Sequence, residues 1–138
     1  AEACTVIASS EFRRQVEART WLSGCGTPRI SGAEAYTRYA SSIPAYSVIF
    51  RNPVNAIALT NSGTRRIAIR PSRLRPWQDG TGSKAELIGT LAHEMTHLVP
   101  GTPMFTDGGH GTAACPDSDL VSYGFGNIAM QVWQAPHP

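Results

Sequence analysis

Residues 91–98 of the chain read Leu-Ala-His-Glu-Met-Thr-His-Leu, and the expected fold is built around this stretch. Two histidines four residues apart, His93 and His97, lie about one turn apart on the same face of a helix. Their imidazoles can therefore approach one metal ion, and Glu94 falls beside the coordination position that stays open. An H-E-x-x-H motif on a helix is typical of zinc-dependent peptide hydrolysis.

The residues around the motif predict a helix with defined ends. Residues 83–86, Ser-Lys-Ala-Glu, fit a capping box at the start, and Pro100-Gly101 predicts the end, because proline lacks the amide hydrogen that a helix needs. One apolar stripe follows at helical spacing, made of Ile88, Leu91, Ala92, Met95 and Val99. The two histidines fall outside that stripe, so we expect them to face a cleft.

Size and composition limit the possible functions. The chain has 138 residues, 41% of them hydrophobic, and we expect a single domain over residues 1–138 with its own core. No apolar run approaches the roughly 20 residues of a membrane-spanning helix. A net charge of +2 does not favour nucleic-acid binding. We therefore expect a monomer with no membrane or nucleic-acid partner, and any signal peptide has been removed or never existed.

Three cysteines, Cys4, Cys25 and Cys115, permit one disulfide. Their spacing gives no C-x-x-C pair and so does not favour a cysteine-bound zinc. A bond between Cys4 and Cys25 would anchor the N-terminal segment, and Cys115 is the alternative partner for either. Three reduced thiols in a cytosolic protein are the remaining possibility. On balance the cysteines favour an oxidising compartment, and we expect a secreted protein.

The rest of the chain predicts a mixture of helices and strands, and thus an α+β fold in which a small sheet packs on helices. Ser9-Ser10 begins a helix that continues over residues 11–22, and Gly24 closes it. Further helices are expected over residues 32–39 and 117–133, the last weakened by Gly124 and Gly126. Short strands are expected over residues 46–50, 56–59 and 65–70, followed by a loop over 71–82.

A catalytic zinc needs a third protein ligand and one position for water. Two candidates, Asp107 and His110, follow the motif in a loop that can fold back under the helix. Two glycines between them permit a tight backbone. Each residue can equally be an ordinary loop residue, since aspartate and glycine are common in turns. Downstream of H-E-x-x-H, however, we expect at least one of the two to bind the metal.

Residues 90–111 resemble the aspzincins, the deuterolysin-like metalloendopeptidases. The likeness consists of H-E-x-x-H at 93–97, then Gly101-Thr102, then Asp107-x-x-His110-Gly111. It implies a zincin-like domain in which His93, His97 and Asp107 bind zinc and Glu94 is the general base. Four residues rather than one separate Gly101-Thr102 from Asp107, and His110 stands where the family has a tyrosine that assists catalysis. On this reading His110 stabilises the oxyanion in place of that tyrosine.

A second resemblance gives His110 the role of metal ligand. SprT-like metalloproteases also carry H-E-x-x-H and a later His-Gly, and residues 107–111, Asp-Gly-Gly-His-Gly, are similar. That family usually has an aromatic residue soon after the His-Gly, whereas residues 112–115 here read Thr-Ala-Ala-Cys. We favour the aspzincin-like ligand set.

The expected function is that of a zinc metalloendopeptidase acting on a peptide or protein substrate. One bound Zn²⁺ lowers the pKa of its water, and Glu94 accepts the proton and passes it to the leaving amine. Two other functions remain open. One is a metal-dependent amidase acting on a non-protein substrate, and the other is a non-catalytic, toxin-like binding domain that keeps zinc for structure.

Other polar residues receive weaker expectations. An extended substrate can pair with the strand over residues 65–70 through backbone hydrogen bonds. Asp117 and Asp119 are candidates to hydrogen-bond the zinc ligands, although they more commonly cap a helix. The arginines of residues 65–75 can bind an acidic substrate, but a solvated sheet edge is the simpler explanation.

Overall fold

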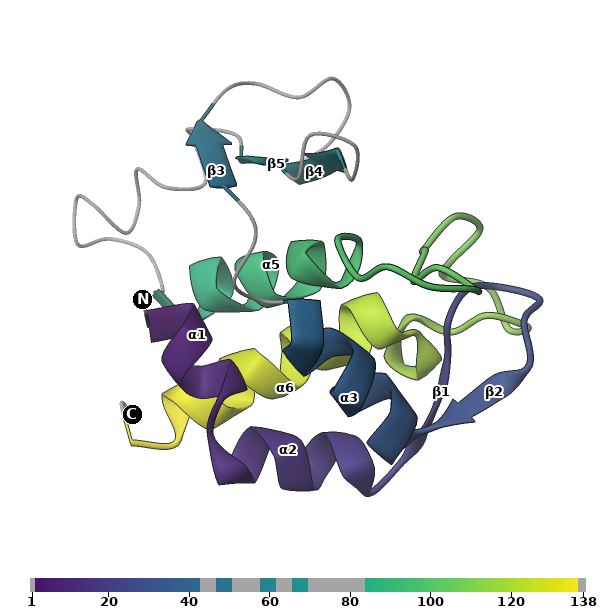
Figure 1. Cartoon of the computed structure of the whole chain (residues 1–138), viewed down its shortest axis with the longest axis horizontal. Coiled ribbons are helices and arrows are strands. Elements are labelled where there is room, and N and C mark those ends of the chain that lie inside the picture. The colour runs from purple at the N-terminus through teal and green to yellow at the C-terminus, as the bar shows by residue number, and fades with distance from the viewer. Residues whose placement is uncertain (1, 43–46, 51–57, 62–65, 70–83, 137–138) are drawn as a thin grey trace.

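The computed structural model describes residues 2–42, 47–50, 58–61, 66–69 and 84–136 (Figure 1). The capping serine at position 83, the loop over residues 71–82 and most of the arginines of residues 65–75 lie outside these ranges. The helices and strands are α1 Glu2–Ile7, α2 Ser10–Glu17, β1 Thr20–Leu22, β2 Arg29–Ser31, α3 Gly32–Ser42, β3 Ser47–Phe50, β4 Ala58–Asn61, β5 Arg66–Ile69, α5 Lys84–Thr96, the 3₁₀ helix η1 Asp117–Asp119 and α6 Val121–Gln134.

Helices α5 and α6 lie side by side at the centre of the molecule and make its most extensive contact between elements (Figure 1). The predicted stripe of α5 is buried at Ile88, Ala92, Met95 and Val99, while Leu91 is half-buried. The α-helix ends at Thr96, and three i→i−3 hydrogen bonds tighten the chain from His97 to Val99. Pro100 follows this turn, as the sequence predicts.

An aromatic cluster joins α6 to α2 and α3. Phe125 of α6 contacts Phe12 and Trp21 edge-to-face and stacks on Tyr39, with ring centroids 5.0–5.7 Å apart. All four side chains are fully buried. The Tyr39 hydroxyl donates to the carbonyl oxygen of Ala92 at 2.7 Å, so α3 is also tied to the helix that carries the motif.

The expected helix over residues 11–22 is wrong at its C-terminal end. Ser9 caps α2 by accepting a hydrogen bond from the Phe12 amide, but α2 ends at Glu17 and residues 20–22 form strand β1. Trp21 lies five residues after Val16, outside the helical stripe. Its indole nitrogen instead donates to the Val16 carbonyl at 2.9 Å, with the ring buried. Strand β1 pairs antiparallel with β2, which the sequence analysis did not anticipate.

A disulfide joins Cys25, just after β1, to Cys115, in the loop before η1. The pairing of Cys4 with Cys25, the first expectation, is therefore wrong, and the alternative through Cys115 is correct. Cys4 lies on α1, half-buried against the core. The bond connects the β1–β2 end of the molecule to the segment that follows Asp107, at the same end in Figure 1.

A second sheet has the strand order β3-β5-β4, with β3 parallel and β4 antiparallel to β5. Strands β4 and β5 contact α5, on the side away from α6 (Figure 1). All three strands lie within one or two residues of the predicted ranges. Strand β5 has a neighbour on each side, so the prediction that a substrate pairs with residues 65–70 is wrong. Its backbone groups are already used within the sheet.

The predicted C-terminal helix is present as η1 followed by α6, and its two glycines are packing positions. A Cβ on Gly126 would lie 2.8 Å from the carbonyl oxygen of Gly89 on α5, and one on Gly124 would overlap the Trp21 ring. The missing side chains therefore let α6 approach α5 and β1 closely. Among the described residues, no helix is both long and apolar enough to cross a membrane.

Candidate metal centre

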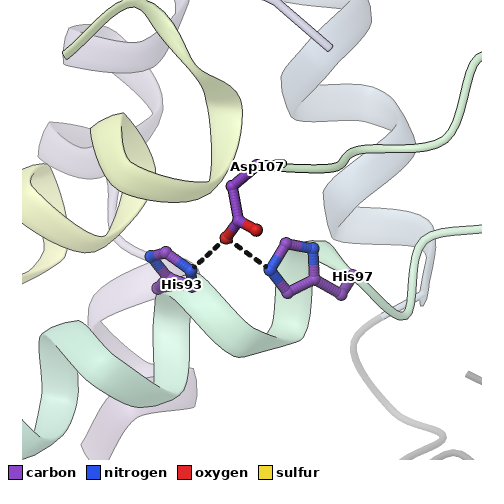
Figure 2. Close-up of side chains that lie close together, drawn as sticks. All are labelled: His93, His97 and Asp107. Atoms are coloured by element: carbon purple, nitrogen blue, oxygen red, sulfur yellow. Dashed lines mark hydrogen bonds and ion pairs between the residues drawn. The ribbon is translucent and has the colours of Figure 1, made fainter. Parts of the chain in front are cut away.

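Three of the residues singled out from the sequence meet at one point, as Figure 2 shows. One carboxylate oxygen of Asp107, Oδ2, lies 2.9 Å from Nε2 of His93 and 3.0 Å from Nε2 of His97. The three ligand atoms all lie within 4.8 Å of one another, so this group can hold a metal ion. Their side chains are 15%, 18% and 31% exposed, in the order His93, His97 and Asp107, and a solvent molecule or a substrate can still reach the group.

The loop after α5 brings Asp107 back to the two histidines. Arg38 of α3 donates to the carbonyl oxygens of Pro103 at 2.9 Å and Pro100 at 3.3 Å. Its guanidinium also lies 4.2 Å from the centre of the buried Phe105 ring. The Thr106 amide donates to the Ser23 carbonyl, which ties the loop to the end of β1. These contacts fix the backbone immediately before Asp107.

A backbone carbonyl orients His97. Nδ1 of this ring lies 2.9 Å from the oxygen of Phe105, which can only accept, so Nδ1 carries the hydrogen. In the neutral ring, Nε2 then has a lone pair directed at the Asp107 carboxylate. Two acceptors face each other at 3.0 Å, and a proton or a cation between them removes the repulsion. This donor set therefore fits a bound metal.

The pKa shifts of His97 and Asp107 in the metal-free protein also favour a bound cation. Burial lowers the pKa of His97, but hydrogen bonds to Asp107 and Phe105 and the charge of Glu94 outweigh it, so the net shift is upward. Hydrogen bonds from His93 and His97 hold the pKa of Asp107 well below its ordinary range. The carboxylate is therefore ionised and ready to accept a cation.

Glu94, the predicted general base, is 7% exposed and lies beside this group. Its negative charge acts on two neighbours, since it raises the pKa of both His97 and Tyr123. Glu94 is thus a buried carboxylate next to a group that can hold a metal ion, and a carboxylate can accept or donate a proton.

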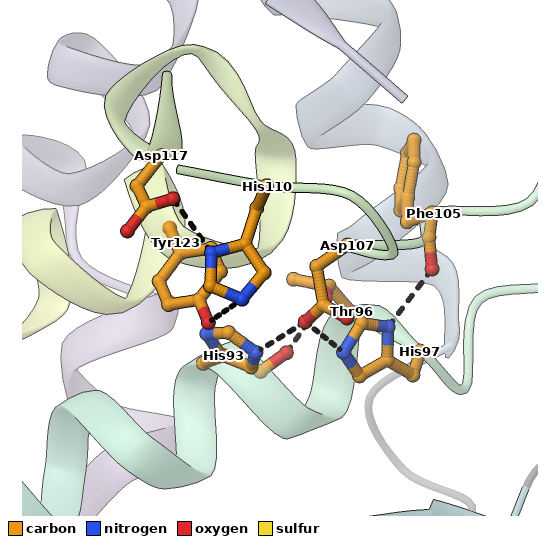
Figure 3. Close-up of polar contacts among 8 residues, drawn as sticks. All are labelled: His93, Thr96, His97, Phe105, Asp107, His110, Asp117 and Tyr123. Atoms are coloured by element: carbon orange, nitrogen blue, oxygen red, sulfur yellow. Dashed lines mark hydrogen bonds and ion pairs between the residues drawn. The ribbon is translucent and has the colours of Figure 1, made fainter. Parts of the chain in front are cut away.

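His110 does not join the three ligand residues, although it lies nearby. Its Nδ1 is 2.8 Å from Oδ1 of Asp117, and its Nε2 is 3.0 Å from the hydroxyl of Tyr123 (Figure 3). The left-handed backbone of Gly109, with φ of 80°, turns the chain between Asp107 and His110, which agrees with the expected role of the glycines.

Neither aspartate of η1 caps this short helix or hydrogen-bonds a predicted ligand of the aspzincin-like set. Pro116 precedes η1 without a side-chain cap, and Asp117 pairs with His110 instead. Asp119 forms an ion pair with Arg29 of β2 at 2.8 Å and lies 3.8 Å from Arg19.

Tyr123 is the residue near the centre that sequence reasoning missed. Its ring lies edge-on to His93, with centroids 4.5 Å apart, and 4.7 Å from the His110 ring. Burial raises its pKa, as do the charges of Asp107, Asp117 and Glu94. No motif spacing links position 123 to position 93. The one available signal is that Tyr123 and Gly126 share a face of α6, one turn apart.

Comparison of the chain with protein-family models, curated proteins and solved structures gave no significant match. The function is therefore inferred from the residues of the centre alone.

Proposed function

We propose that this chain is a zinc-dependent metallopeptidase of the zincin type that hydrolyses peptide bonds in peptide or protein substrates. The observation that carries the proposal is the convergence of His93, His97 and Asp107 on one point, with the carboxylate of Glu94 buried beside them. Three protein ligands that leave a fourth position open are the arrangement of catalytic zinc sites, whereas structural sites are usually closed by four.

The spacing of the ligand atoms supports zinc. Tetrahedral ligands at the usual zinc distances are about 3.3 Å apart. Oδ2 of Asp107 lies 2.9 Å from Nε2 of His93 and 3.0 Å from Nε2 of His97, within a few tenths of an ångström of that value. Two histidines and one carboxylate also suit iron in oxygen-activating enzymes. Glu94 favours zinc, because hydrolysis needs a base at this position and oxygen chemistry does not.

In this proposal each residue has a defined task. A bound Zn²⁺ supplies an acidified water and polarises the scissile carbonyl. His93, His97 and Asp107 hold the ion, as in the aspzincin-like ligand set. Glu94 takes a proton from the attacking water and delivers it to the leaving amine.

His110 receives a different role from the one that the sequence suggests. Direct support of an oxyanion requires a ring nitrogen that is turned toward the centre with a hydrogen to donate. Both nitrogens of His110 are engaged, one with Asp117 and the other with Tyr123. We therefore assign His110 a positioning role. The same contacts argue against the SprT-like alternative, in which this imidazole binds the metal.

Secretion is also part of the proposal. The Cys25–Cys115 disulfide is of the kind that persists in oxidising compartments and is rare in the cytosol.

The test combines metal analysis with proteolysis. Wild-type protein should contain one zinc per chain and cleave an unfolded protein substrate. Glu94→Gln should keep the zinc and lose about 100-fold or more of kcat, since general bases typically contribute that much. Glu86→Gln is the matched control, because Glu86 lies exposed in the first turn of the same helix and should behave as wild type.

The outcomes separate the remaining functions. Cleavage of a small non-protein amide, but of no peptide, identifies the amidase. Bound zinc with equal inactivity of wild type and Glu94→Gln indicates a structural zinc domain. Iron in place of zinc, or no bound metal at all, contradicts the proposal.

A further inference from the structure

Three polar side chains form a continuous row beside the metal ligands, as Figure 3 shows. Asp117 of η1, His110 of the preceding loop and Tyr123 of α6 are linked by contacts of 2.8 Å and 3.0 Å. The three residues come from three successive segments, so the row exists only because the loop over residues 107–117 folds onto the start of α6.

The direction of each hydrogen bond follows from the donors available. An ionised carboxylate can only accept, so Nδ1 of His110 donates to Asp117. In the neutral ring Nε2 is then an acceptor, and the Tyr123 hydroxyl must donate to it. Asp117 thus selects the His110 tautomer, and that tautomer holds the phenol in one orientation.

The far end of the row contacts a metal ligand. The ring of Tyr123 stands at 85° to the ring of His93, with centroids 4.5 Å apart. An edge-to-face contact of this kind is favourable and fixes the relative orientation of two rings. One turn further along α6, Gly126 leaves room for the Cβ of His93, which a Cβ on Gly126 would approach to 3.2 Å. His93 is therefore packed against α6 at two successive positions.

His93 depends on this packing more than His97 does. His97 donates through Nδ1 to the Phe105 carbonyl, which orients its ring directly. Among the described residues, the His93 ring makes one hydrogen bond, to Asp107, through the nitrogen that would bind the metal. Metal-binding histidines normally need a second partner to fix the ring. For His93 the available partner is the ring of Tyr123.

We propose that Asp117, His110 and Tyr123 form a positioning relay that orients the metal ligand His93. Asp117 fixes the tautomer of His110, His110 holds the hydroxyl of Tyr123, and the ring of Tyr123 holds the His93 ring with Nε2 toward Asp107. The relay rests on the proposed metal centre, but it acts on metal binding itself and does not require that the protein cleave peptides.

The test measures zinc affinity by competition with a chelating dye, and the absorption spectrum of the Co²⁺-substituted protein. Tyr123→Leu should weaken zinc binding about 10- to 100-fold, the usual effect of removing an orienting partner. Tyr123→Phe keeps the ring and should weaken it less. His110→Ala should match Tyr123→Phe, because both break the same bond. The double variant of His110→Ala and Tyr123→Phe should bind zinc no more weakly than either single variant, since the two residues act in series.

Tyr36 supplies the matched control. It is half-buried on α3, where it contacts Phe12 and Arg13, and its replacement by Phe or Leu should leave zinc affinity unchanged. Far-UV circular dichroism and thermal unfolding of the metal-free proteins show whether each variant folds. If Tyr123→Leu does not fold, the comparison of Tyr123→Phe, His110→Ala and their double variant still decides the question.

A second measurement does not involve the metal. Nitrogen-15 NMR of the metal-free protein should find His110 with its hydrogen on Nδ1, and Asp117→Asn should change the tautomer ratio. Tyr123→Phe should shift the Nε2 resonance of His110.

Several results overturn the relay. Unchanged zinc affinity in His110→Ala rules it out, as do fully additive effects of the His110 and Tyr123 changes. Loss of all zinc in His110→Ala, with zinc retained in Asp107→Ala, would make His110 a ligand instead. Failure of the proposed function looks different: the wild type binds zinc and cleaves nothing, while the variants still show the graded loss of affinity.

Discussion

The two histidines of the motif are four residues apart, His93 in the last turn of α5 and His97 in the turn that follows it, and yet different parts of the molecule hold them. His97 is oriented by a backbone carbonyl, in a loop that Arg38 clamps from α3. His93 is oriented by an aromatic side chain of α6. A backbone carbonyl is present whatever residue stands at position 105. The His93 contact depends on particular side chains and on the distance between two helices, and it should therefore be the more easily disrupted.

The largest expected effect comes from opening the disulfide, which holds the loop that carries His110 and Asp117. Replacing Cys25 and Cys115 together by serine should lower the free energy of unfolding by about 2–4 kcal/mol, because the bond closes a long stretch of chain. Zinc affinity should also fall, since the relay to His93 loses its anchor. Urea unfolding and dye competition measure the two effects.

Cys4→Ser is the control for this change, because Cys4 lies outside the disulfide. It should keep the zinc affinity of the wild type. An unchanged zinc affinity in the variant without Cys25 and Cys115 would mean that the loop keeps its conformation without the disulfide. The orientation of His93 would then be no more easily disrupted than that of His97.

A smaller effect is expected from separating the two central helices. Gly126→Ala places a methyl group against the Gly89 carbonyl, and because that neighbour is backbone, α5 and α6 must move apart. Overpacking typically costs about 1–3 kcal/mol, offset in part by the better helix propensity of alanine, about 1 kcal/mol. Urea unfolding should report the net loss, and zinc affinity should fall because Tyr123 moves away from His93.

Gly108→Ala is the matched substitution, since a Cβ at that position meets nothing within 4 Å and the backbone there is not left-handed. Equal stability and equal zinc affinity of Gly126→Ala and Gly108→Ala would contradict the importance of the close helix contact.

The smallest effect on zinc affinity is expected on the His97 side. Arg38→Leu removes two hydrogen bonds to the loop and a cation–π contact with Phe105. We expect a loss of about 1–2 kcal/mol in the free energy of unfolding. Zinc affinity should fall by less than about 10-fold, because the bond from His97 to Phe105 remains.

Arg13→Leu is the comparison, because Arg13 makes an exposed ion pair with Glu17 within α2 and a cation–π contact with Tyr36. Exposed ion pairs of this kind contribute little to the free energy of unfolding. If Arg38→Leu weakened zinc binding more than Tyr123→Leu, the surroundings of His97 would be the more easily disrupted, contrary to the expectation.

Local signals in the sequence were sufficient for most elements. Strands β3, β4 and β5 were placed within one or two residues, α3 was predicted from its start, and the buried stripe of α5 follows from periodicity. Helix α1 was missed although Ala3, Val6 and Ile7 show helical spacing. Strand β1 was taken for helix, because nothing local distinguishes the end of α2 from its continuation. The tertiary contact of Trp21 with the core decides that boundary.

The sequence by itself determined the chemistry available at the centre. Two histidines at helical spacing with a glutamate between them predict a metal-binding helix, because the helix repeat alone puts the imidazoles on one face. The tertiary structure decided which later residue joins them. Both Asp107 and His110 can reach the helix along the chain. The turn at Gly109 and the disulfide at Cys115 place Asp107 against the two imidazoles and direct His110 to Tyr123. Tyr123 lies beside His93 only because α6 packs on α5, and no local sequence pattern predicts that contact.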